Sequence, residues 1–166
     1  MPEHVVRRTA RAILLDGADL LLFKRTRPGV EPYWTTVGGG FEAEDSCLED
    51  TLRREVLEEI GGRLGRVSQV FVFADHGPDR RGPGLWILHL FLAELAELDP
   101  SLRCGPELDD PSRGTYELVR VPFTPAGIAA VNLHPPEVAQ FLVTTCAALA
   151  ASVHTAVSRP TSTSSS

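Results

Sequence analysis

Three glutamates, Glu55, Glu58 and Glu59, are the residues whose spacing most clearly suggests chemistry. In a helix each residue turns the chain by about 100°, so Glu58 and Glu59 lie at about −60° and +40° from Glu55, on one face. Like charges at these spacings cost a helix roughly 0.2–0.5 kcal/mol per pair, and a bound cation would relieve the repulsion. Carboxylates without a His or Cys ligand favour Mg²⁺ or Mn²⁺ over zinc. The alternative interpretation is an ordinary acidic, solvent-exposed helix face.

A helix over residues 45–60 is predicted to carry these glutamates. Its apolar residues recur every four positions, and a glycine pair supplies a stop: Leu48, Leu52, Val56, Ile60, then Gly61-Gly62. Upstream, Gly38, Gly39 and Gly40 indicate a backbone that bends or closely approaches another group. We expect these glycines to end a short strand over residues 33–37. The glycine turn and the helix together form the most informative stretch of the chain.

The remaining elements alternate irregularly between strands and helices. Turn residues Asp16-Gly17 between two apolar runs predict a hairpin, and a nearly continuous apolar run predicts a central strand. The predicted strands cover residues 5–15, 20–24, 66–74, 85–95 and 115–121, a loop covers 99–114, and a last helix runs from Pro135-Pro136 to near His154. This order predicts an α/β protein with a mixed central sheet between helices, an α/β/α sandwich. One domain is expected over residues 1–154, followed by a disordered Ser/Thr-rich tail over 155–166.

Composition excludes several classes of protein. Sixteen basic and 22 acidic side chains give a net charge of −6, the wrong sign for binding nucleic acid. Cys47, Cys104 and Cys146 lie far apart, which suggests neither a zinc site nor a disulfide framework and fits a reducing cytoplasm. The chain has no uninterrupted run of 18 apolar residues, and residues 1–11 lack the apolar core of an export signal. We therefore expect a cytoplasmic protein without a membrane span.

The run from Arg54 to Gly61, REVLEEIG, preceded by Gly38-Gly39, resembles the signature of the Nudix (MutT-like) hydrolases, G-x5-E-x7-R-E-U-x-E-E-x-G-U with U aliphatic. The second half matches at every defined position but the last, which is Gly62. If Gly39 is the first glycine of the signature, Asp45 stands at the first glutamate and one extra residue precedes Arg54. Counting back without an insertion places Ser46 there instead. A proline often precedes the glycines of the signature, and Val37 occupies that position in this chain. The resemblance extends over about residues 5–150.

The resemblance implies Mg²⁺-dependent hydrolysis of a diphosphate linkage in a nucleoside diphosphate joined to another moiety, with Mn²⁺ as an alternative metal. It implies that Glu55, Glu58 and Glu59 bind the metal, and that Glu55 also orients or deprotonates the attacking water. The backbone carbonyl of Gly38 would complete the coordination. Arg54 lies four residues before Glu58 and would brace that carboxylate.

A further acid from a later loop is recruited by many members of this family. Glu107 is our candidate for that metal ligand, with Asp109 and Asp110 behind it. An acidic loop of this composition is more often simply solvated.

The substrate would contact residues outside the signature helix. Arg25 and Arg27 follow the second predicted strand and are candidates for gripping phosphate, as are the backbones of Gly39 and Gly40. A solvated strand end is the alternative for the arginines, and Arg80-Arg81 has the same ambiguity.

Aromatic and histidine side chains offer weaker signals. Tyr33 and Trp34 could stack a base, although packing is favoured. His76 could act as an acid or base, but a lone loop histidine more often has no chemical role. The loops over residues 25–32, 75–84 and 99–114 would select the substrate, so the signature leaves its identity open.

Other functions on the same fold stay open as alternatives. A prenyl-diphosphate isomerase is expected to use a catalytic cysteine, and Cys47 at the helix start has no apparent role of that kind. A non-catalytic ligand-sensing module would not need three mutually repelling acids. A structural interaction protein is neither supported nor excluded. Homodimers are common in the family, but the sequence does not decide this point.

Overall fold

The computed structural model describes residues 4–76, 83–105 and 110–157. These residues form, in chain order, β1 (Val5–Asp16), β2 (Asp19–Arg27), β3 (Val30–Thr35), β4 (Val37–Gly40), α1 (Leu48–Ile60), β5 (Gly62–His76), β6 (Leu85–Leu98), β7 (Thr115–Pro122), α2 (Pro125–Ala129), β8 (Leu133–His134) and α3 (Pro136–Val157). Two 3₁₀ turns, η1 (Pro100–Leu102) and η3 (Pro111–Arg113), lie within the predicted loop.

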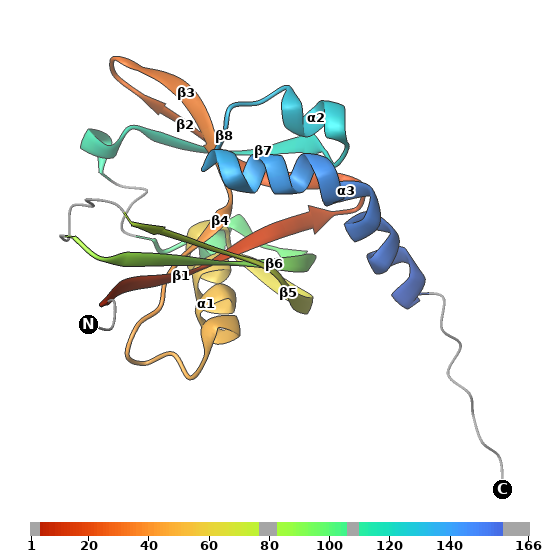
Figure 1. Ribbon diagram of the computed structural model, residues 1–166, viewed down its shortest axis with the longest axis horizontal. Helices are drawn as coiled ribbons and strands as arrows, with labels where there is room; N and C mark the ends of the chain where they lie inside the picture. The colour runs from red at the N-terminus through yellow and green to blue at the C-terminus, as the bar shows by residue number, and fades with distance from the viewer. Residues whose placement is uncertain (1–3, 77–82, 106–109, 158–166) are drawn as a thin grey trace, which may run out of the picture.

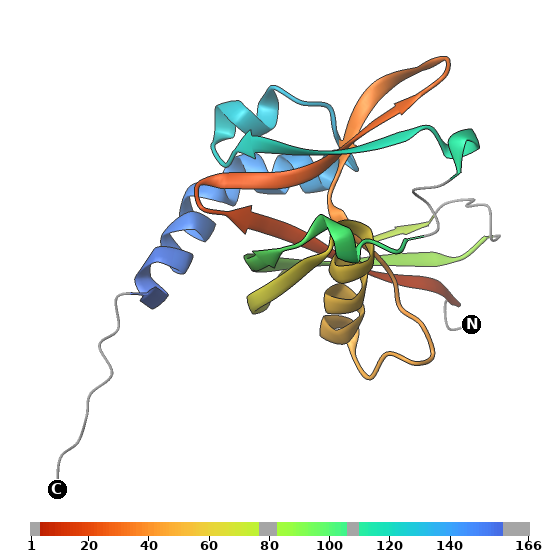
Figure 2. The same ribbon diagram turned by 180° about the vertical axis from the view of Figure 1, so that it is seen from behind.

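The described strands form one mixed sheet in the order β5-β6-β1-β2-β3-β8, with β4 paired to β1 and β7 paired to β2. β1 is parallel to β6 on one edge. Its other edge is shared, because residues 9–12 pair with β4 and residues 14–16 pair with β2. The sheet therefore forks at β1. Figures 1 and 2 show β2, β3 and β7 in the upper half of the molecule and β5 and β6 in the lower half.

Side-chain alternation along the strands separates the core into two parts. Ile13, Leu20 and Leu22 belong to one buried cluster, which α3 covers with Val138 and Leu142. The alternate residues belong to the second cluster, which α1 covers: Ala12, Leu14, Leu21 and Phe23, with Leu52, Val56 and Ile60 of the helix. Because strand side chains point to opposite faces in turn, one sheet holds helices on both faces. The predicted α/β/α sandwich with a mixed sheet is confirmed.

The boundaries of α1 are set at both ends by backbone hydrogen bonds. The Asp45 N–H donates to the Glu42 carbonyl (3.1 Å) and the Glu42 N–H donates to Asp45 Oδ2 (3.0 Å). This turn keeps Asp45 out of the helix, so the predicted start at residue 45 was wrong by three residues. At the other end Gly61 has φ +72° and its N–H donates to the Leu57 carbonyl (2.8 Å), so the predicted glycine stop is confirmed.

The predicted end of a strand at the glycines was wrong. Gly38, Gly39 and Gly40 do not break a strand but form part of β4, where they lie opposite Arg11, Ala10 and Thr9 of β1. The preceding strand, β3, ends at Thr35. β4 forms because its backbone pairs with β1, and this pairing stabilises the strand despite the weak strand propensity of glycine.

Other elements match with shifted ends. The hairpin, the central place of β6 between β5 and β1, and β7 are confirmed. β5 is longer than predicted, and α2 and β8 were not predicted. α3 continues to Val157, three residues past the predicted domain end, and residues 158–166 of the predicted tail lie outside the described residues.

The last helix is unusually apolar for its position. The window Pro136–His154 is long and apolar enough to cross a membrane by length and composition, although Val138, Leu142 and Cys146 pack into the core. The expected absence of an uninterrupted run of 18 apolar residues holds in α3, where Glu137, Gln140, Thr144 and Thr145 interrupt the run, although its average hydropathy stays high. Only 17% of the window is buried, and its C-terminal part extends past the sheet (Figures 1 and 2).

His89 is a polar side chain buried in β6, at 7% exposure. Its Nε2 lies 3.1 Å from Arg8 Nη1 and its Nδ1 lies 3.1 Å from Gln69 Oε1. Because arginine only donates, Nε2 accepts and Nδ1 carries the hydrogen in this assignment. Burial, and then the charge of Arg8, lower the pKa of His89 from its ordinary value of 6.5.

The lowered pKa of His89 predicts a pH-dependent stability. As pH falls below about 6.5, His89 becomes protonated in the unfolded chain but stays neutral in the folded protein, because its folded pKa is lower. The free energy of unfolding should therefore fall by at most about 1.4 kcal/mol per pH unit. Urea unfolding at pH 7.5 and pH 5.5 measures this loss. H89Q should remove most of the difference, whereas H4Q, which changes an exposed histidine, should retain it. An unchanged difference in H89Q would contradict the assignment.

Candidate active site

The glycine strand β4 brings the backbone against the glutamate face of α1. The Gly38 N–H donates to Glu59 Oε2 at 2.9 Å. Gly38 has φ +135°, and a Cβ there would overlap the Ala10 carbonyl of β1. Only glycine tolerates both the positive φ and the close approach of the Ala10 carbonyl. Gly38 therefore lets its backbone N–H come within hydrogen-bond distance of Glu59.

The next two glycines make room for charged side chains. A Cβ on Gly39 would overlap the carboxylate of Glu55, and a Cβ on Gly40 would lie 2.8 Å from Nη2 of Arg7. Glu55 from α1 and Arg7 from β1 therefore occupy the space that side chains on β4 would fill. The predicted close approach at these glycines is present, although its partners here are residues of the chain itself.

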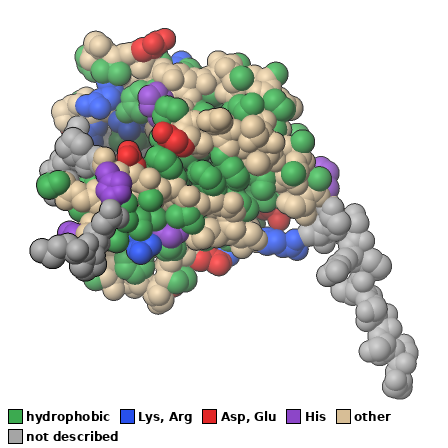
Figure 3. Space-filling model, in the orientation of Figure 1, with side chains coloured by type: hydrophobic (Ala, Val, Ile, Leu, Met, Phe, Trp, Pro, Cys, Tyr) green, Lys and Arg blue, Asp and Glu red, His purple; other side chains and the backbone are tan. Residues whose placement is uncertain are grey.

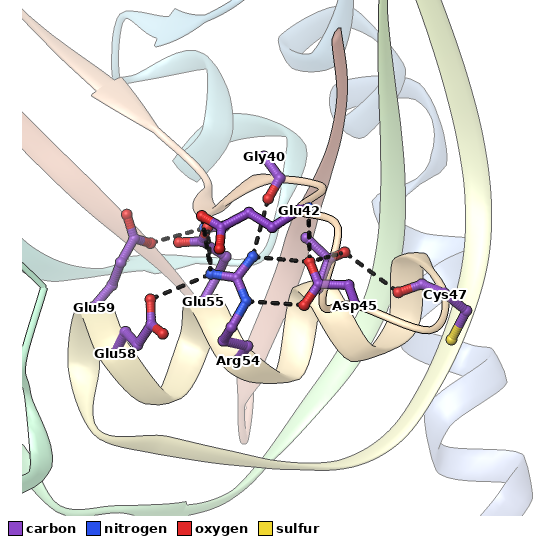
Figure 4. A network of polar contacts seen from close by, with 10 residues as sticks. Gly40, Glu42, Asp45, Cys47, Arg54, Glu55, Glu58 and Glu59 are labelled. Carbon is purple, nitrogen blue, oxygen red and sulfur yellow. Dashed lines mark hydrogen bonds and ion pairs between the residues drawn. The ribbon is translucent and has the colours of Figure 1, made fainter.

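Arg54 lies at the centre of a network of acids, shown in Figure 4. Its Nη1 lies 3.1 Å from Glu55 Oε1 and 3.3 Å from Glu58 Oε2. The opposite edge donates to Asp45, with Nε to Oδ1 and Nη2 to Oδ2 both at 2.9 Å, and Nη2 also donates to the Gly40 carbonyl at 3.0 Å. The predicted bracing of Glu58 is present, and the same nitrogen also contacts Glu55.

Asp45, and not Ser46, faces Arg54. The Asp45 side chain is 5% exposed and also accepts a hydrogen bond from Thr51 Oγ1 at 2.8 Å. Ser46 is exposed. Hydrogen bonding from the Arg54 guanidinium holds the pKa of Asp45 well below its usual range. Of the two residues that the sequence left open at the first glutamate of the signature, Asp45 is the one that contacts Arg54.

Glu55 lies where ionising its carboxyl group is costly. Its side chain is 15% exposed, and burial raises its pKa, an effect that the neighbouring Arg54 guanidinium partly offsets. The charge of Glu58 raises it further. An additional cation beside Glu55 would stabilise its charged form.

The donor set fits a hard divalent cation in its chemistry. Glu55, Glu58 and Glu59 offer only oxygen donors on one face of α1, and one guanidinium nitrogen lies within 3.3 Å of two of them. Among the described residues, no group of three His, Cys, Asp or Glu side chains is arranged as a ready metal site. Arg54 contacts the carboxylates of Glu55 and Glu58, and the Gly38 N–H donates to that of Glu59. The three glutamate side chains would therefore have to turn in order to bind a metal ion. Glu107 lies outside the described residues.

A cavity of about 130 Å³, the inner cavity, lies where the sheet forks. It is lined from α1 by Glu55 and Glu59, from β4 by the three glycines, and from the facing strands by Arg7, Arg11, Phe23, Arg25, Thr35 and Tyr116. Arg25 was predicted as a phosphate contact, and the structure brings it beside the glutamates. Arg27 lines an adjacent cavity instead.

Arg7 and Arg11 were missed as site residues. Both lie on β1 and reach the inner cavity, and Arg11 Nη1 also donates to the Thr36 carbonyl at 2.8 Å. Their separation by four residues places them on one face of a strand, which is the signal that the sequence offers. That signal does not tell which face opens into a cleft.

The weaker candidates lie outside the inner cavity. Trp34 is half-buried and packs on the core cluster under α3, as the packing interpretation predicts. Tyr33 lines the adjacent cavity, and His76 is exposed at the end of β5. Cys47 is exposed at the other end of the network from Glu59 (Figure 4), which gives no support to a catalytic thiol.

A family model described as NUDIX domain matches residues 5–137. The chain belongs to the Nudix family. It is accordingly a hydrolase of the Nudix type, which acts on pyrophosphate bonds, and the resemblance noted in its sequence is confirmed. No curated protein matches the chain.

Solved Nudix structures share the fold. A NUDIX hydrolase from Nitrosomonas europaea is 16% identical, with 89% of each chain covered and a TM-score of 0.60. A MutT protein from Bacillus halodurans is 23% identical over 82% of this chain and 79% of that chain, with a TM-score of 0.56. A structure named ADP compounds hydrolase is 18% identical over 74% of this chain and 60% of that chain, with a TM-score of 0.53. At these identities the likeness concerns the fold.

Because the Glu55 carboxylate lies against Gly39, adding a single methyl group at this glycine is predicted to have a strong effect on activity. G39A should displace the Glu55 carboxylate and lower hydrolysis of a diphosphate substrate by about 100-fold, because small misplacements of catalytic groups have effects of this size. In G65A the new Cβ would lie 3.7 Å from the Glu94 carbonyl, an ordinary contact, so this variant is the matched control. Steady-state kinetics of both variants test the prediction. Wild-type activity in G39A would show that the position of Glu55 is not critical.

The pair between Asp45 and Arg54 predicts a stability effect. D45N should lower the free energy of unfolding at pH 7 by about 1.5–3 kcal/mol, the usual range for a hydrogen bond to a charged group. D50N removes an exposed acid from the first turn of α1 and is the control. Since the pKa of Asp45 is lowered from 3.8, the difference between wild type and D45N should be full above pH 4 and shrink as pH falls further. Urea unfolding at several pH values measures both effects, and equal stability of D45N and D50N would contradict them.

Proposed function

We propose that this Nudix enzyme hydrolyses, with Mg²⁺ as its cofactor, a diphosphate linkage in a nucleoside diphosphate joined to another moiety. The observation that carries the proposal is the inner cavity. Glu55 and Glu59 lie on one side of it, and Arg7, Arg11 and Arg25 lie among its other lining residues. A diphosphate with a divalent cation carries both signs of charge and matches both kinds of lining.

Glu55, Glu58 and Glu59, with the Gly38 carbonyl, would hold the Mg²⁺, or Mn²⁺ in its place. When bound, the ion neutralises phosphate charge and makes a coordinated water more acidic. Glu55 is more enclosed than Glu58, at 15% against 36% side-chain exposure, and is our choice for orienting or deprotonating the attacking water. Glu107 is kept as a predicted additional ligand.

The arginines of the inner cavity would bind the phosphate groups. As water adds to one phosphorus, the bridging P–O bond breaks and the leaving oxygen gains negative charge. Guanidinium groups from Arg7 and Arg11 would neutralise that charge and position the diphosphate against α1. Arg54 would keep Glu55 and Glu58 at a fixed spacing, which makes it a positioning residue.

The proposed setting is a reducing cytoplasm. Cys47, Cys104 and Cys146 are free thiols in the structure, which this setting accommodates. The proposal needs no second subunit, because every residue assigned to the site comes from one chain.

A single carboxamide substitution tests the proposal. E58Q should lower kcat by at least about 100-fold, since the amide loses the charge that holds the cation while the side chain keeps its size. E49Q is the matched control, because Glu49 lies on the same helix and pairs with Arg53 at 2.8 Å, outside the site. Both variants should be assayed with Mg²⁺ and with Mn²⁺ against nucleoside triphosphates, dinucleoside polyphosphates, nucleotide sugars and ADP-ribose.

Three outcomes separate the alternatives. Metal-dependent turnover that survives in E49Q and is lost in E58Q supports the proposal. Turnover at the wild-type level in E58Q would overturn the metal-site assignment. Ligand binding without turnover of any substrate in the wild type would instead favour the sensing module.

A further inference from the structure

Arg25, which lines the inner cavity, lies between two tyrosines of neighbouring strands. β2 pairs with β3 on one side and with β7 on the other, and the register places Arg25 opposite Tyr33 of β3 and opposite Tyr116 of β7. Residues directly opposite one another in a sheet share a face. The three side chains therefore form a row across the sheet. Figure 3 shows Lys and Arg side chains gathered around a hollow on this side of the molecule.

Tyr116 makes the closer contact with the Arg25 guanidinium. The guanidinium carbon lies over the Tyr116 ring, 3.4 Å from its centre, and 5.8 Å from the ring centre of Tyr33. At the shorter distance the cation touches the ring face and is attracted by its π electrons. Nη2 of Arg25 also donates to the Arg113 carbonyl at 2.8 Å. Contacts within the chain thus fix the direction of this guanidinium.

Tyr116 is itself supported by the core. Its ring meets the ring of Phe23 edge to face, with ring centres 5.8 Å apart and planes at 89°. Phe23 is buried in the core cluster that α1 covers, and Tyr116 packs against the same cluster. Because a close-packed core yields little, the Tyr116 ring is a rigid support for the guanidinium.

The Arg25 guanidinium keeps donors that the described part of the chain does not satisfy. A guanidinium carries five N–H donors. One of them is used by the Arg113 carbonyl, whereas Nε is buried and has no hydrogen-bond partner among the described residues. A buried donor without a partner is costly. A phosphate oxygen in the inner cavity is an acceptor that such donors could bind.

We propose that Tyr116 is a positioning residue, whose ring holds the Arg25 guanidinium in the orientation that binds the phosphate groups of the substrate. This inference rests on the proposed function, which places a diphosphate in the inner cavity. Arg25 and Tyr116 both line that cavity, together with Glu55 and Glu59. A free arginine side chain loses rotational freedom when it binds an anion, whereas a stacked guanidinium has already lost it. Tyr116 thereby strengthens substrate binding through Arg25.

Stacking on a nucleobase is the alternative role for a tyrosine beside a nucleotide. In this structure the Arg25 guanidinium covers one face of the Tyr116 ring, and Phe23 packs against the ring as well. A base would have to displace the guanidinium in order to stack on the covered face. The contacts therefore favour support of Arg25 over binding of a base.

A double-mutant cycle tests whether Tyr116 acts through Arg25. With the nucleotide that the wild type hydrolyses fastest, Y116L should raise KM about tenfold with kcat little changed, an effect within the range of one cation–π contact. In an R25Q background the same substitution should change KM by less than about twofold, because the guanidinium is already absent. Y116F keeps the ring and should restore most of the affinity.

The matched control is F71L. This substitution also removes one ring of an aromatic pair, since Phe71 stacks on Phe141 with ring centres 4.4 Å apart, but it lies in the core cluster under α3. F71L should leave KM near the wild-type value. Should Y116L fail to fold in urea unfolding, Y116M takes its place, because its flexible side chain can fill more of the space beside Phe23.

Two kinetic outcomes would overturn the inference while the proposed hydrolysis stands. If Y116L raises KM equally in the wild-type and R25Q backgrounds, Tyr116 acts independently of Arg25. If Y116F and Y116L lose the same affinity, the hydroxyl group is responsible and not the ring.

Binding of inorganic pyrophosphate separates the two roles of Tyr116 without turnover of a nucleotide. In isothermal titration calorimetry with pyrophosphate and Mg²⁺, Y116L should bind about tenfold more weakly than the wild type, and F71L should bind as the wild type does. Because pyrophosphate has no base, equal affinity in Y116L and the wild type, or no binding to the wild type, would overturn the inference. If no nucleotide is hydrolysed, the proposed function fails for those substrates, and this titration still decides the role of Tyr116.

Discussion

The repulsion between two carboxylates one helical turn apart is the constraint on which the rest of the site depends. Glu55 and Glu58 have like charges, and burial adds to the cost of charging Glu55. Arg54 offsets both costs with one nitrogen, while Asp45 fixes its other edge through two hydrogen bonds. Asp45 also closes the turn with Glu42 that precedes α1. The start of the helix, the direction of Arg54 and the spacing of the carboxylates are therefore one linked arrangement.

The fork in the sheet supplies the other half of the site. Because one edge of β1 pairs with β4 over one stretch and with β2 over the next, β4 and β2 diverge, and a cavity lies between them. The glycines of β4 line that cavity without filling it. A side chain at Gly38 would meet β1, and one at Gly39 would meet Glu55. The same backbone thus completes the sheet and keeps the site open.

The sequence predicts the parts of this structure that depend on local periodicity. The four-residue spacing of Leu52, Val56 and Ile60 predicts α1 because those side chains are the ones buried against the sheet. It does not predict β4, because propensity treats consecutive glycines as a break, while the pairing partner that stabilises them comes from β1. Nor does it separate Asp45 from Ser46, since their spacing to Arg54 differs by one residue and only the fold decides which side chain faces the guanidinium. The cavity role of Arg11 depends on the fork, which involves pairings between distant segments.

The mixture of charges in the inner cavity restricts what can bind there. A free divalent cation would be attracted by Glu55 and Glu59 and repelled by Arg7 and Arg11, and a free phosphate would experience the opposite pair of effects. In a space of about 130 Å³ these opposing interactions act at short range, so neither ion alone suits the whole lining. A complex of a cation with a phosphorylated ligand matches both sides at once. If the proposed complex of a cation and a phosphorylated ligand binds there, the arginines and the glutamates are complementary parts of one site. The arginines favour the phosphate and the glutamates favour the cation, so each component binds better when the other is bound.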